Sequence, residues 1–399
     1  SRLRSGSTER NLVSENFDAI IVGLGAMGSA AAYQFAKRRA KVLGLDRYAP
    51  PHTLGSTHGE TRITRVANGE GLEYSPLALR ANTLWREIER ESGTDLLTQN
   101  GFAAIAGKKR AAKAGNAEFL EVTIAAAKAA GIDYEIFAGK EFRERFPAFN
   151  VQDDDTVYFD RVGGFLRPEA CVETQLKLAK NKGAEIHLNE QVLTFEQTHG
   201  MVRVKTAAAE YSAKTLVLAA GPWLPELMEA KLMPGLKVTR QIVCWFRVKA
   251  AARIEDFQPQ RFPVFVWQVP AEQISYGFPA LGGREDGVKV STEQYAVAVD
   301  PDNMDRTVSV AEQNALYDEY VGPYFPGLDR ACVRSAVCLY TSVPDSRFVI
   351  DRHPVHSGVI VASPCSGHGF KPSAAIGEAV AQMALGEPHL DLSEFRFRA

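Results

Sequence analysis

Residues 17–28 read FDAIIVGLGAMG, and this stretch decides the fold. The apolar run over 19–22 predicts a buried parallel strand, and small, helix-forming residues follow the glycines. In this G-x-G-x-x-G pattern Gly23 permits a tight turn, Gly25 lets backbone approach a pyrophosphate, and Gly28 lets helix and strand pack closely. The N-terminus of the helix then offers free N–H groups to the phosphates.

A G-x-G-x-x-G pattern alone is weak evidence, so its surroundings matter. A second strand is predicted over 41–45, and it ends on Asp46. An acid about 20 residues beyond the glycines is the expected partner of an adenosine ribose hydroxyl. The alternative is a glycine-rich turn in an ordinary α/β unit, but the full context favours a dinucleotide-binding domain.

Bulk composition narrows the class of protein. A chain of 399 residues favours two domains, and a formal charge of −2 argues against nucleic-acid partners or a polybasic membrane role. No apolar run is long enough to span a bilayer. Residues 1–16 are polar and lack the apolar core of a signal peptide, so we expect a flexible leader.

The cysteines and histidines predict neither disulfides nor a metal site. The five cysteines are odd in number and scattered, which suits reduced thiols in the cytoplasm. The eight histidines show no metal-ligand spacing, so we expect no structural metal.

Two later segments resemble returns to the first sheet. Residues 215–218 form an apolar run that leads into Gly221, although any central strand followed by a helix could read this way. Residues 359–362 form another, and the loop SGHGFKP and a final helix over 373–385 follow it. A dinucleotide domain built from the beginning, middle and end of the chain is typical of flavin rather than nicotinamide binding.

Three further motifs carry a family resemblance: GSTHGETRITR at 55–65, SAVCLYT at 335–341 and SGHGFK at 366–371. Together they resemble the monomeric sarcosine oxidase family, which includes N-methyltryptophan oxidase and pipecolate oxidase. The resemblance runs from residue 17 to about residue 395. It implies a flavoenzyme that transfers a hydride equivalent from the C–N carbon of a secondary amine, an N-methyl or cyclic amino acid, to N5 of FAD. The imine then hydrolyses, and oxygen reoxidises the flavin to give hydrogen peroxide.

The resemblance also implies the architecture. The expected fold class is α/β (α+β overall), like glutathione reductase and D-amino-acid oxidase, with a discontinuous Rossmann-like FAD-binding domain. A substrate domain with a mostly antiparallel sheet fits strand-like segments at 237–246, 264–269, 274–278 and 288–291. We expect residues 17–95, 150–232 and 336–399 to form the FAD-binding domain, and residues 96–149 and 233–335 the substrate domain.

A basic cluster follows the second predicted strand. His58, Arg62 and Arg65 would share one face of a helix at their spacings of four and three, although surface cation clusters are common. The resemblance places His58 and Arg62 in the catalytic site, with Arg62 over the flavin ring, and pairs Arg65 with the substrate carboxylate. An arginine fork suits a planar carboxylate.

Strand alternation sets Cys338 and Tyr340 on one face of a predicted strand. A lone strand cysteine is commonly a small buried hydrophobe, but the resemblance implies a covalent bond from Cys338 to the 8α-methyl of FAD. It also implies that Tyr340 and Tyr276 line the substrate pocket, whereas tyrosines of the ordinary core would read the same way.

Two lysines complete the expected site. Lys289 alternates with two valines, so it faces either solvent or the flavin, and the resemblance implies a water-mediated contact to N5 that promotes the reaction with oxygen. Lys371 precedes Pro372 at the start of the last helix. The resemblance makes it the second partner of the substrate carboxylate, and a solvated lysine is the alternative.

The flavin-binding positions follow from the same motifs. The resemblance assigns FAD to Gly23, Gly25, Gly28, Asp46, Ser56, Val192, Gly221, Cys338, Gly367, His368 and Gly369.

One position departs from the family pattern. Glu293 stands where sarcosine and N-methyltryptophan oxidases carry a histidine, four residues past the oxygen-activating lysine. A pocket carboxylate would favour a cationic or larger amine and repel a second carboxylate, whereas a strand-end glutamate commonly points to solvent. We expect Glu293 to contact substrate, and the identity of the amine stays open.

Three other functions compete with a monomeric oxidase acting on a small amine and O2. A nicotinamide-dependent dehydrogenase is disfavoured by Cys338 and the late glycine loop. A flavoprotein amine dehydrogenase of the same fold would pass electrons to another acceptor, whereas Lys289 favours oxygen. A non-catalytic dinucleotide-binding module would leave Arg65 and Lys371 without a task.

Overall fold

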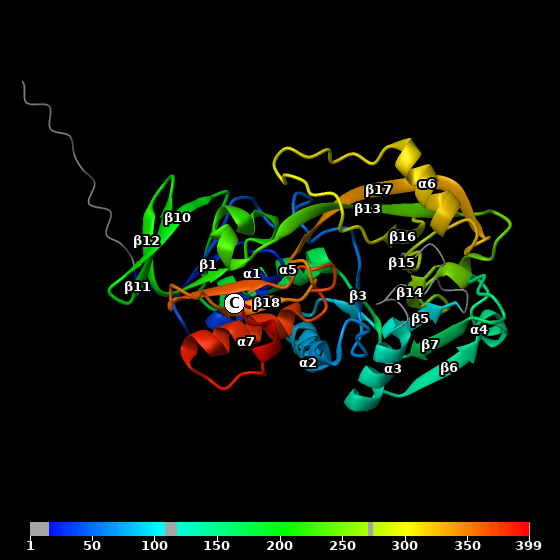
Figure 1. Cartoon of the computed structure of the whole chain (residues 1–399), viewed down its shortest axis with the longest axis horizontal. Helices are drawn as coiled ribbons and strands as arrows, with labels where there is room; N and C mark the ends of the chain where they lie inside the picture. Colours follow the sequence, from blue (N-terminus) through cyan, green and yellow to red (C-terminus); the bar gives the residue numbers. More distant parts are fainter. Residues whose placement is uncertain (1–15, 108–117, 270–273, 399) are drawn as a thin grey trace, which may run out of the picture.

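Two eight-stranded sheets organise the chain, one at the left and one at the right of Figure 1. This computed structural model describes residues 16–107, 118–269 and 274–398. The expected leader therefore lies outside the described residues, apart from Asn16 at the start of the first strand.

The first sheet has the strand order β10-β11-β12-β1-β2-β9, with β19 on β12 and β18 on β19. Its strands are β1 (Asn16–Val22), β2 (Val42–Asp46), β9 (Glu185–Leu188), β10 (Val192–Thr198), β11 (Met201–Thr206), β12 (Glu210–Leu218), β18 (Val349–Arg352) and β19 (Val359–Ser363). The beginning, middle and end of the chain thus share one sheet, as predicted from the glycine-flanked apolar runs.

Parallel pairing brings the functional loops to one edge of this sheet. Val22 of β1 pairs with Leu45 of β2 and with Leu218 of β12, and Leu218 pairs in turn with Val361 of β19. The carboxyl ends of four strands therefore meet, which is where open α/β sheets bind ligands.

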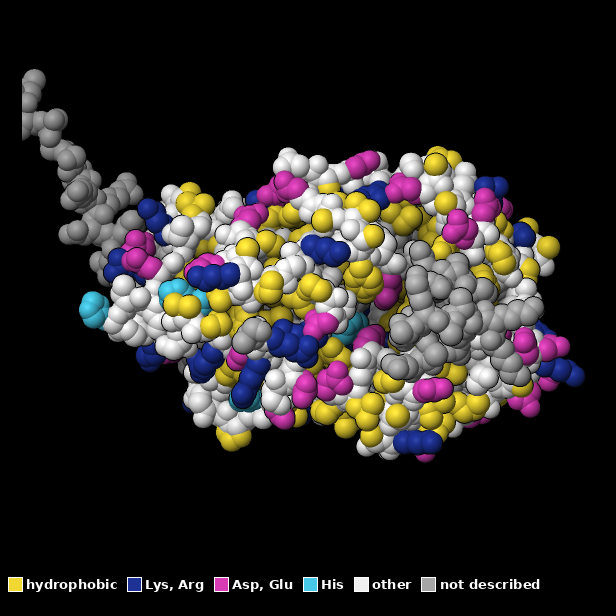
Figure 2. All heavy atoms as spheres, viewed as in Figure 1, with side chains coloured by type: hydrophobic (Ala, Val, Ile, Leu, Met, Phe, Trp, Pro, Cys, Tyr) yellow, Lys and Arg dark blue, Asp and Glu magenta, His cyan; other side chains and the backbone are white. Residues whose placement is uncertain are grey.

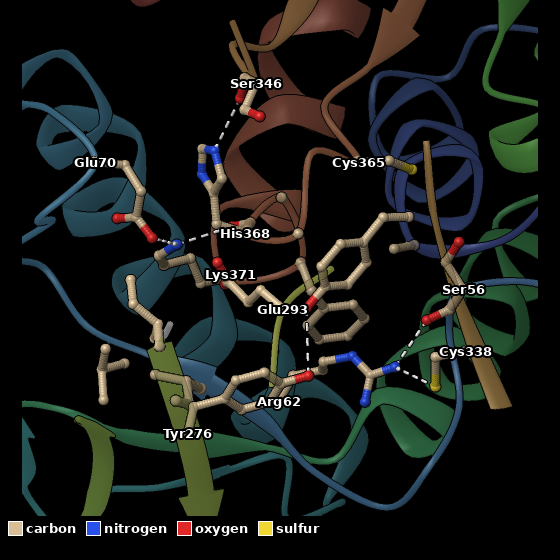
Figure 3. Close-up of a pocket in the computed structure, with 18 of the residues that line it drawn as sticks. Ser56, Arg62, Glu70, Tyr276, Glu293, Cys338, Ser346, Cys365, His368 and Lys371 are labelled. Atoms are coloured by element: carbon tan, nitrogen blue, oxygen red, sulfur yellow. Dashed lines mark hydrogen bonds and ion pairs between the residues drawn. The ribbon is translucent and has the colours of Figure 1, made fainter. Parts of the chain in front are cut away.

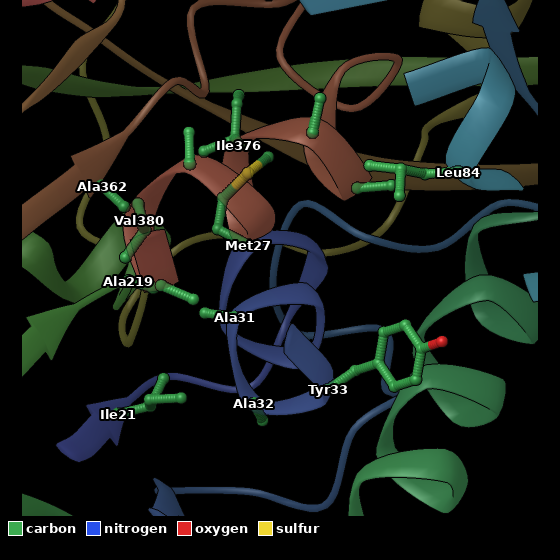
Figure 4. Packing of buried hydrophobic residues seen from close by; sticks show 14 of the residues in the cluster. Ile21, Met27, Ala31, Ala32, Tyr33, Leu84, Ala219, Ala362, Ile376 and Val380 are labelled. Atoms are coloured by element: carbon green, nitrogen blue, oxygen red, sulfur yellow. The ribbon is translucent and has the colours of Figure 1, made fainter. Parts of the chain in front are cut away.

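Four helices cover one face of the first sheet: α1 (Ala26–Lys37), α2 (Ser75–Ser92), α5 (Pro168–Asn181) and α7 (Ser373–Leu385). Alternation along β1 points Ile21 toward them, where it joins Ala31 and Ile376 in the main apolar cluster (Figure 4). Small residues let these elements approach closely. A Cβ on Gly28 would lie 1.7 Å from the carbonyl oxygen of Gly23, so only glycine fits there.

The second sheet has the order β17-β13-β16-β15-β14-β5-β7-β6, and its pairs are antiparallel except for β14 with β5. Its strands are β5 (Phe102–Ala106), β6 (Tyr134–Ala138), β7 (Thr156–Asp160), β13 (Lys237–Val248), β14 (Val264–Gln268), β15 (Ile274–Phe278), β16 (Val288–Thr292) and β17 (Leu328–Ser342). A mostly antiparallel sheet was expected. However, β7 falls in the segment 150–232 that we assigned to the other domain, and β17 runs across the expected boundary at 336.

Smaller elements surround the two sheets. The helices α3 (Glu118–Ala130), α4 (Gly139–Arg145) and α6 (Val310–Tyr320) contact β5, β6 and β17, respectively. A third sheet of β3 (Arg62–Thr64), β8 (Gly164–Leu166) and β4 (Leu97–Thr98) completes the fold.

The predicted helix through His58, Arg62 and Arg65 is wrong. Residues 55–61 form a loop, and Arg62 begins β3, which pairs with β8. Gly59 and Glu60 have φ angles of +93° and +72°, in the left-handed region that a right-handed helix excludes. Strand pairing with a partner about a hundred residues away overrides the local spacing.

Charges of both signs are interspersed on the face shown in Figure 2. Within residues 16–107, 118–269 and 274–398, no helix combines the length and the apolarity needed to cross a membrane. The same part of the chain contains no cluster of three His, Cys, Asp or Glu side chains that could hold a metal ion.

Candidate active site

Two adjoining cavities lie in the part of the chain that the structure describes; the first cavity is lined in part by strands of the second sheet, and the second cavity in part by strands of the first sheet. The first has a volume of about 310 Å³, and the second lies at the carboxyl ends of the parallel strands. Met27, Ser56 and Cys365 line both cavities, so the two are neighbours. An extended ligand could therefore reach from the glycine loop to the second sheet.

The second cavity collects residues expected to bind the adenosine and pyrophosphate of a dinucleotide. These are Gly23, Gly25, Asp46, Ser56, Val192 and Gly221. Asp46 is held by two backbone amides, since its Oδ2 accepts from Leu24 N at 2.7 Å and its Oδ1 from Tyr48 N at 2.8 Å. Burial raises the pKa of Asp46, although these two hydrogen bonds act to lower it. Gly28 is not among the lining residues of this cavity; it lies in the contact between α1 and β1.

The cavity walls fit an FAD molecule. A Cβ on Gly25 would meet only Thr57 Oγ1, at 3.6 Å, and a Cβ on Gly221 would meet nothing within 4 Å, so backbone is open to a ligand at both points. His368 lies in the first cavity beside Gly367 and Gly369. Its Nε2 donates to Ser346 O at 3.1 Å, and its buried Nδ1 has no partner among the described residues. That nitrogen is a free acceptor for a ligand donor.

Cys338 of β17 lies in the first cavity as a buried thiol (Figure 3). Its Sγ is 3.6 Å from Arg62 Nη2 and 3.6 Å from His58 Nε2. Burial alone would raise the pKa of Cys338, but Arg62, His58 and Lys289 outweigh it and lower the pKa to about 6. A thiolate is the reactive form of cysteine, so this position is poised to form a bond.

Lys289 of β16 faces the cavity and is 2% exposed, which excludes the solvent-facing alternative. Its Nζ donates to Gly59 O at 2.7 Å, Thr61 O at 2.8 Å and Thr61 Oγ1 at 3.0 Å. Burial, with a further effect from Arg62, holds the pKa of this lysine well below its usual value. The three oxygens stabilise an ammonium in this buried place.

Arg65 and Lys371 meet in the first cavity, as expected, but an acid that the sequence analysis missed lies between them. Glu70 Oε1 is 2.6 Å from Arg65 Nη2 and 3.8 Å from Lys371 Nζ. Burial opposes ionisation of Glu70, yet the two cations keep its pKa well below the usual range. The Nε of Arg65 has no partner in the described part of the chain, so one buried donor is left over. The position of Glu70, five residues after Arg65 in a glycine-flanked turn, was the available signal.

Tyr276, Tyr340, Glu293 and Arg62 complete the lining, whereas His58, which was expected in the catalytic site, lines neither cavity. Tyr276 and Tyr340 meet with their hydroxyls 3.3 Å apart, and Glu293 also lines the first cavity. Arg62 donates to Ser56 O at 2.8 Å and to Thr61 O at 2.8 Å, which fixes its guanidinium near Cys338.

Glu169 is a second residue that the sequence analysis missed. Its Oε1 accepts from Gly59 N at 2.6 Å and from Glu60 N at 3.1 Å. It thereby holds the loop whose carbonyl oxygens bind Lys289. No sequence motif marks it, because it belongs to the first turn of α5 and its role depends on tertiary contacts.

Fold and site together define a flavin-dependent oxidoreductase. The sequence signature of the family described as FAD dependent oxidoreductase matches residues 18–383, and the chain belongs to this family.

Named relatives are similar over nearly the whole chain. Monomeric sarcosine oxidase of Bacillus sp. (strain NS-129) is 38% identical over 386 residues, which cover 96% of this chain and 97% of that protein. N-methyl-L-tryptophan oxidase of Yersinia pestis (strain Pestoides F) is 33% identical over 390 residues, 96% of this chain and 100% of that protein. The resemblance drawn from the motifs is thus confirmed.

Solved structures agree on the fold. A variant of NikD, described as an unusual amino acid oxidase essential for nikkomycin biosynthesis, superposes with a TM-score of 0.82. The superposition covers 96% of this chain and 98% of the NikD chain, and the two sequences are 21% identical.

Proposed function

We propose that this chain is an FAD-dependent oxidase of secondary amines that bear a carboxylate, such as N-methyl or cyclic amino acids. The observation that carries the proposal is the buried pair Arg65 and Lys371, which faces the same cavity as Cys338 and Lys289. A cationic corner for a carboxylate thus lies beside the groups expected to hold a flavin. The sarcosine and N-methyltryptophan oxidases among the relatives support this substrate class.

The chemistry that FAD would supply when bound is uptake of the hydride equivalent from the carbon next to nitrogen and transfer of two electrons to O2, which would become H2O2. The residues of the chain orient the reactants. Arg65 and Lys371 hold the substrate carboxylate, and Tyr276 and Tyr340 line the space beside it. The oxidised product is an imine, which water cleaves to an amine and a carbonyl compound.

Cys338 is proposed to bond covalently to the flavin. Cys338 would hold FAD through a bond from its Sγ to the 8α-methyl carbon; a thiolate and the methyl group would lose one proton and two electrons in forming it, with O2 as the electron acceptor. The thiolate character that Arg62 and His58 give Cys338 supports this role.

Lys289 is proposed to promote reoxidation. A positive charge held beside the reduced ring lowers the cost of forming superoxide there. The three oxygen acceptors hold Nζ of Lys289 in place and favour its ammonium form, against the burial that lowers its pKa.

The organisation of the chain is part of the same proposal. The segments of the first sheet, with Cys338 and the loop at 366–371, would hold FAD, and most of the second sheet would form the substrate domain. A monomer is supported by relatives named monomeric sarcosine oxidase. Five cysteines, each free in the structure, support a cytoplasmic location.

A peroxide assay tests the proposal. Purified holoenzyme is incubated in air with N-methyl and cyclic amino acids and, in parallel, with the matching amines that lack the carboxylate. We expect peroxide from the carboxylates, and Arg65→Gln should raise their KM by at least tenfold. Equal turnover of the amines without a carboxylate would contradict the proposal.

A further inference from the structure

Glu293 presents a carboxylate to the substrate cavity. It follows β16, where residues 289, 291 and 293 alternate to the same side, and Lys289 already faces the cavity. Figure 3 shows Glu293 between Lys371 and Arg62. Its Oε2 accepts from Tyr295 OH at 3.3 Å, and no Lys, Arg or His nitrogen of the described residues lies within 4 Å of it.

The nearby cations are already engaged. Glu70 pairs with Arg65 and lies within 4 Å of Lys371, so this corner holds two cations and two carboxylates. Burial and the repulsion from Glu70 raise the pKa of Glu293 to about 7. Glu293 is half-buried in the cavity wall, where a carboxylate without a cationic partner is costly, and a ligand cation would relieve that cost.

A substrate carboxylate would change the balance of positive and negative charges in this corner. Bound to Arg65 and Lys371, it would make three carboxylates around two cations. The amine that is oxidised cannot restore neutrality, because its nitrogen must be uncharged when its neighbouring carbon loses hydride. Either Glu293 takes up a proton, or a second cation on the substrate pairs with Glu293 and keeps it ionised.

We propose that Glu293 selects amino acids whose side chain ends in an ammonium or guanidinium group, while their secondary amine is oxidised. This inference rests on the proposed function and names its substrate class.

The apolar walls of the cavity suit such a side chain. Ile63, Val266, Ile274 and Phe278 line the cavity together with the charged corner. Long cationic side chains bury their methylene stems on apolar surfaces and keep the charged end on a polar partner. Glu293, with Tyr295 beside it, provides that partner.

Matched substrates give the test. Holoenzyme is assayed with α-N-methyl-lysine against α-N-methyl-norleucine, and with α-N-methyl-ornithine against α-N-methyl-norvaline. Each pair differs by the terminal ammonium. We expect kcat/KM to favour the cationic member by about 10- to 100-fold, as for a desolvated charge pair. Binding is measured separately, from the substrate concentration that half-saturates anaerobic bleaching of the flavin.

Variants assign the preference to Glu293. Glu293→Gln should reduce it to less than about threefold, whereas Glu285→Gln, on a side chain 71% exposed, should leave it unchanged. Glu293→Asp keeps the charge on a shorter side chain and should shift the preference from ornithine to lysine derivatives. This variant tests the inference even if Glu293→Gln does not fold.

The assay distinguishes failure of this inference from failure of the proposed function. If the uncharged analogues bleach the flavin as well as the cationic ones, or if Glu293→Gln keeps the preference, this inference is wrong and the proposed function stands. If no secondary amine of any charge bleaches the flavin, the proposed function itself fails.

Discussion

Glu70 accepts a hydrogen bond from Nη2 of Arg65 at 2.6 Å, so the arginine proposed to bind the substrate already holds a carboxylate. The same Oε1 atom lies 3.8 Å from Lys371 Nζ. Under the proposed function, a substrate carboxylate would enter a corner that is already organised around a negative group, and its affinity would depend on the charge of both cations.

We expect Lys371 to make substrate affinity pH-dependent. Burial lowers its pKa to about 8, although Glu70 opposes the shift. The protonated lysine binds a carboxylate and the neutral one does not, so KM should rise as pH increases through about 8. Lys371→Arg should abolish this rise, because arginine stays charged. Glu70→Gln should move it to lower pH, and an identical pH profile in all three proteins would refute the assignment.

Cys338→Ala should release the flavin. In the wild type, acid precipitation should leave the yellow colour in the pellet, and in the variant the colour should move to the supernatant. Cys365→Ala is the matched control, because Cys365 lines the same cavities but burial raises its pKa to about 11. It should keep the flavin in the pellet. Release from the wild type, or from Cys365→Ala alone, would count against a bond at Cys338.

Lys289→Met should slow reoxidation of the flavin by oxygen by roughly 10²–10³-fold, the usual cost of removing one preorganised electrostatic group. Reduction by substrate should change less than about tenfold. Stopped-flow absorbance follows each half-reaction, and Lys289→Arg should retain most of the oxygen reactivity. Equal losses in both half-reactions would indicate only a structural role through the loop at Gly59 and Thr61.

Two glycines separate folding from cofactor binding. Gly28→Ala would place a Cβ 1.7 Å from Gly23 O and should cost about 1–3 kcal/mol or more of unfolding free energy. Gly25→Ala would point its Cβ into the cavity, so stability should hold while FAD content falls. Both are measured in a Cys338→Ala background, where flavin is free to dissociate. The reverse pattern would place the cofactor elsewhere.

The sequence predicted those parts of the site that depend on local patterns. The glycine loop after β1 and the faces of Cys338 and Lys289 follow from periodicity within single strands. The family motifs then located Arg65, Lys371 and the loop of Gly367, His368 and Gly369.

The sequence could not predict contacts made by distant partners. The loop through His58 reads as helical until its pairing with β8 and its anchor at Glu169 are known. Glu70 was missed for a related reason, because its role arises only when the loop before α7 brings Lys371 Nζ to 3.8 Å from its Oε1. Strand β7 joins the second sheet by pairing with β5, a choice that no local pattern decides.

Anaerobic mixing tests the central claim most directly. The visible flavin band of the purified holoenzyme is recorded while N-methyl and cyclic amino acids are added without oxygen, and air is then admitted. We predict that the band bleaches with at least one such amine and returns in air with one H2O2 released for each flavin reoxidised. A band that no secondary amine bleaches, or one that bleaches and yields no peroxide in air, would contradict an amine oxidase.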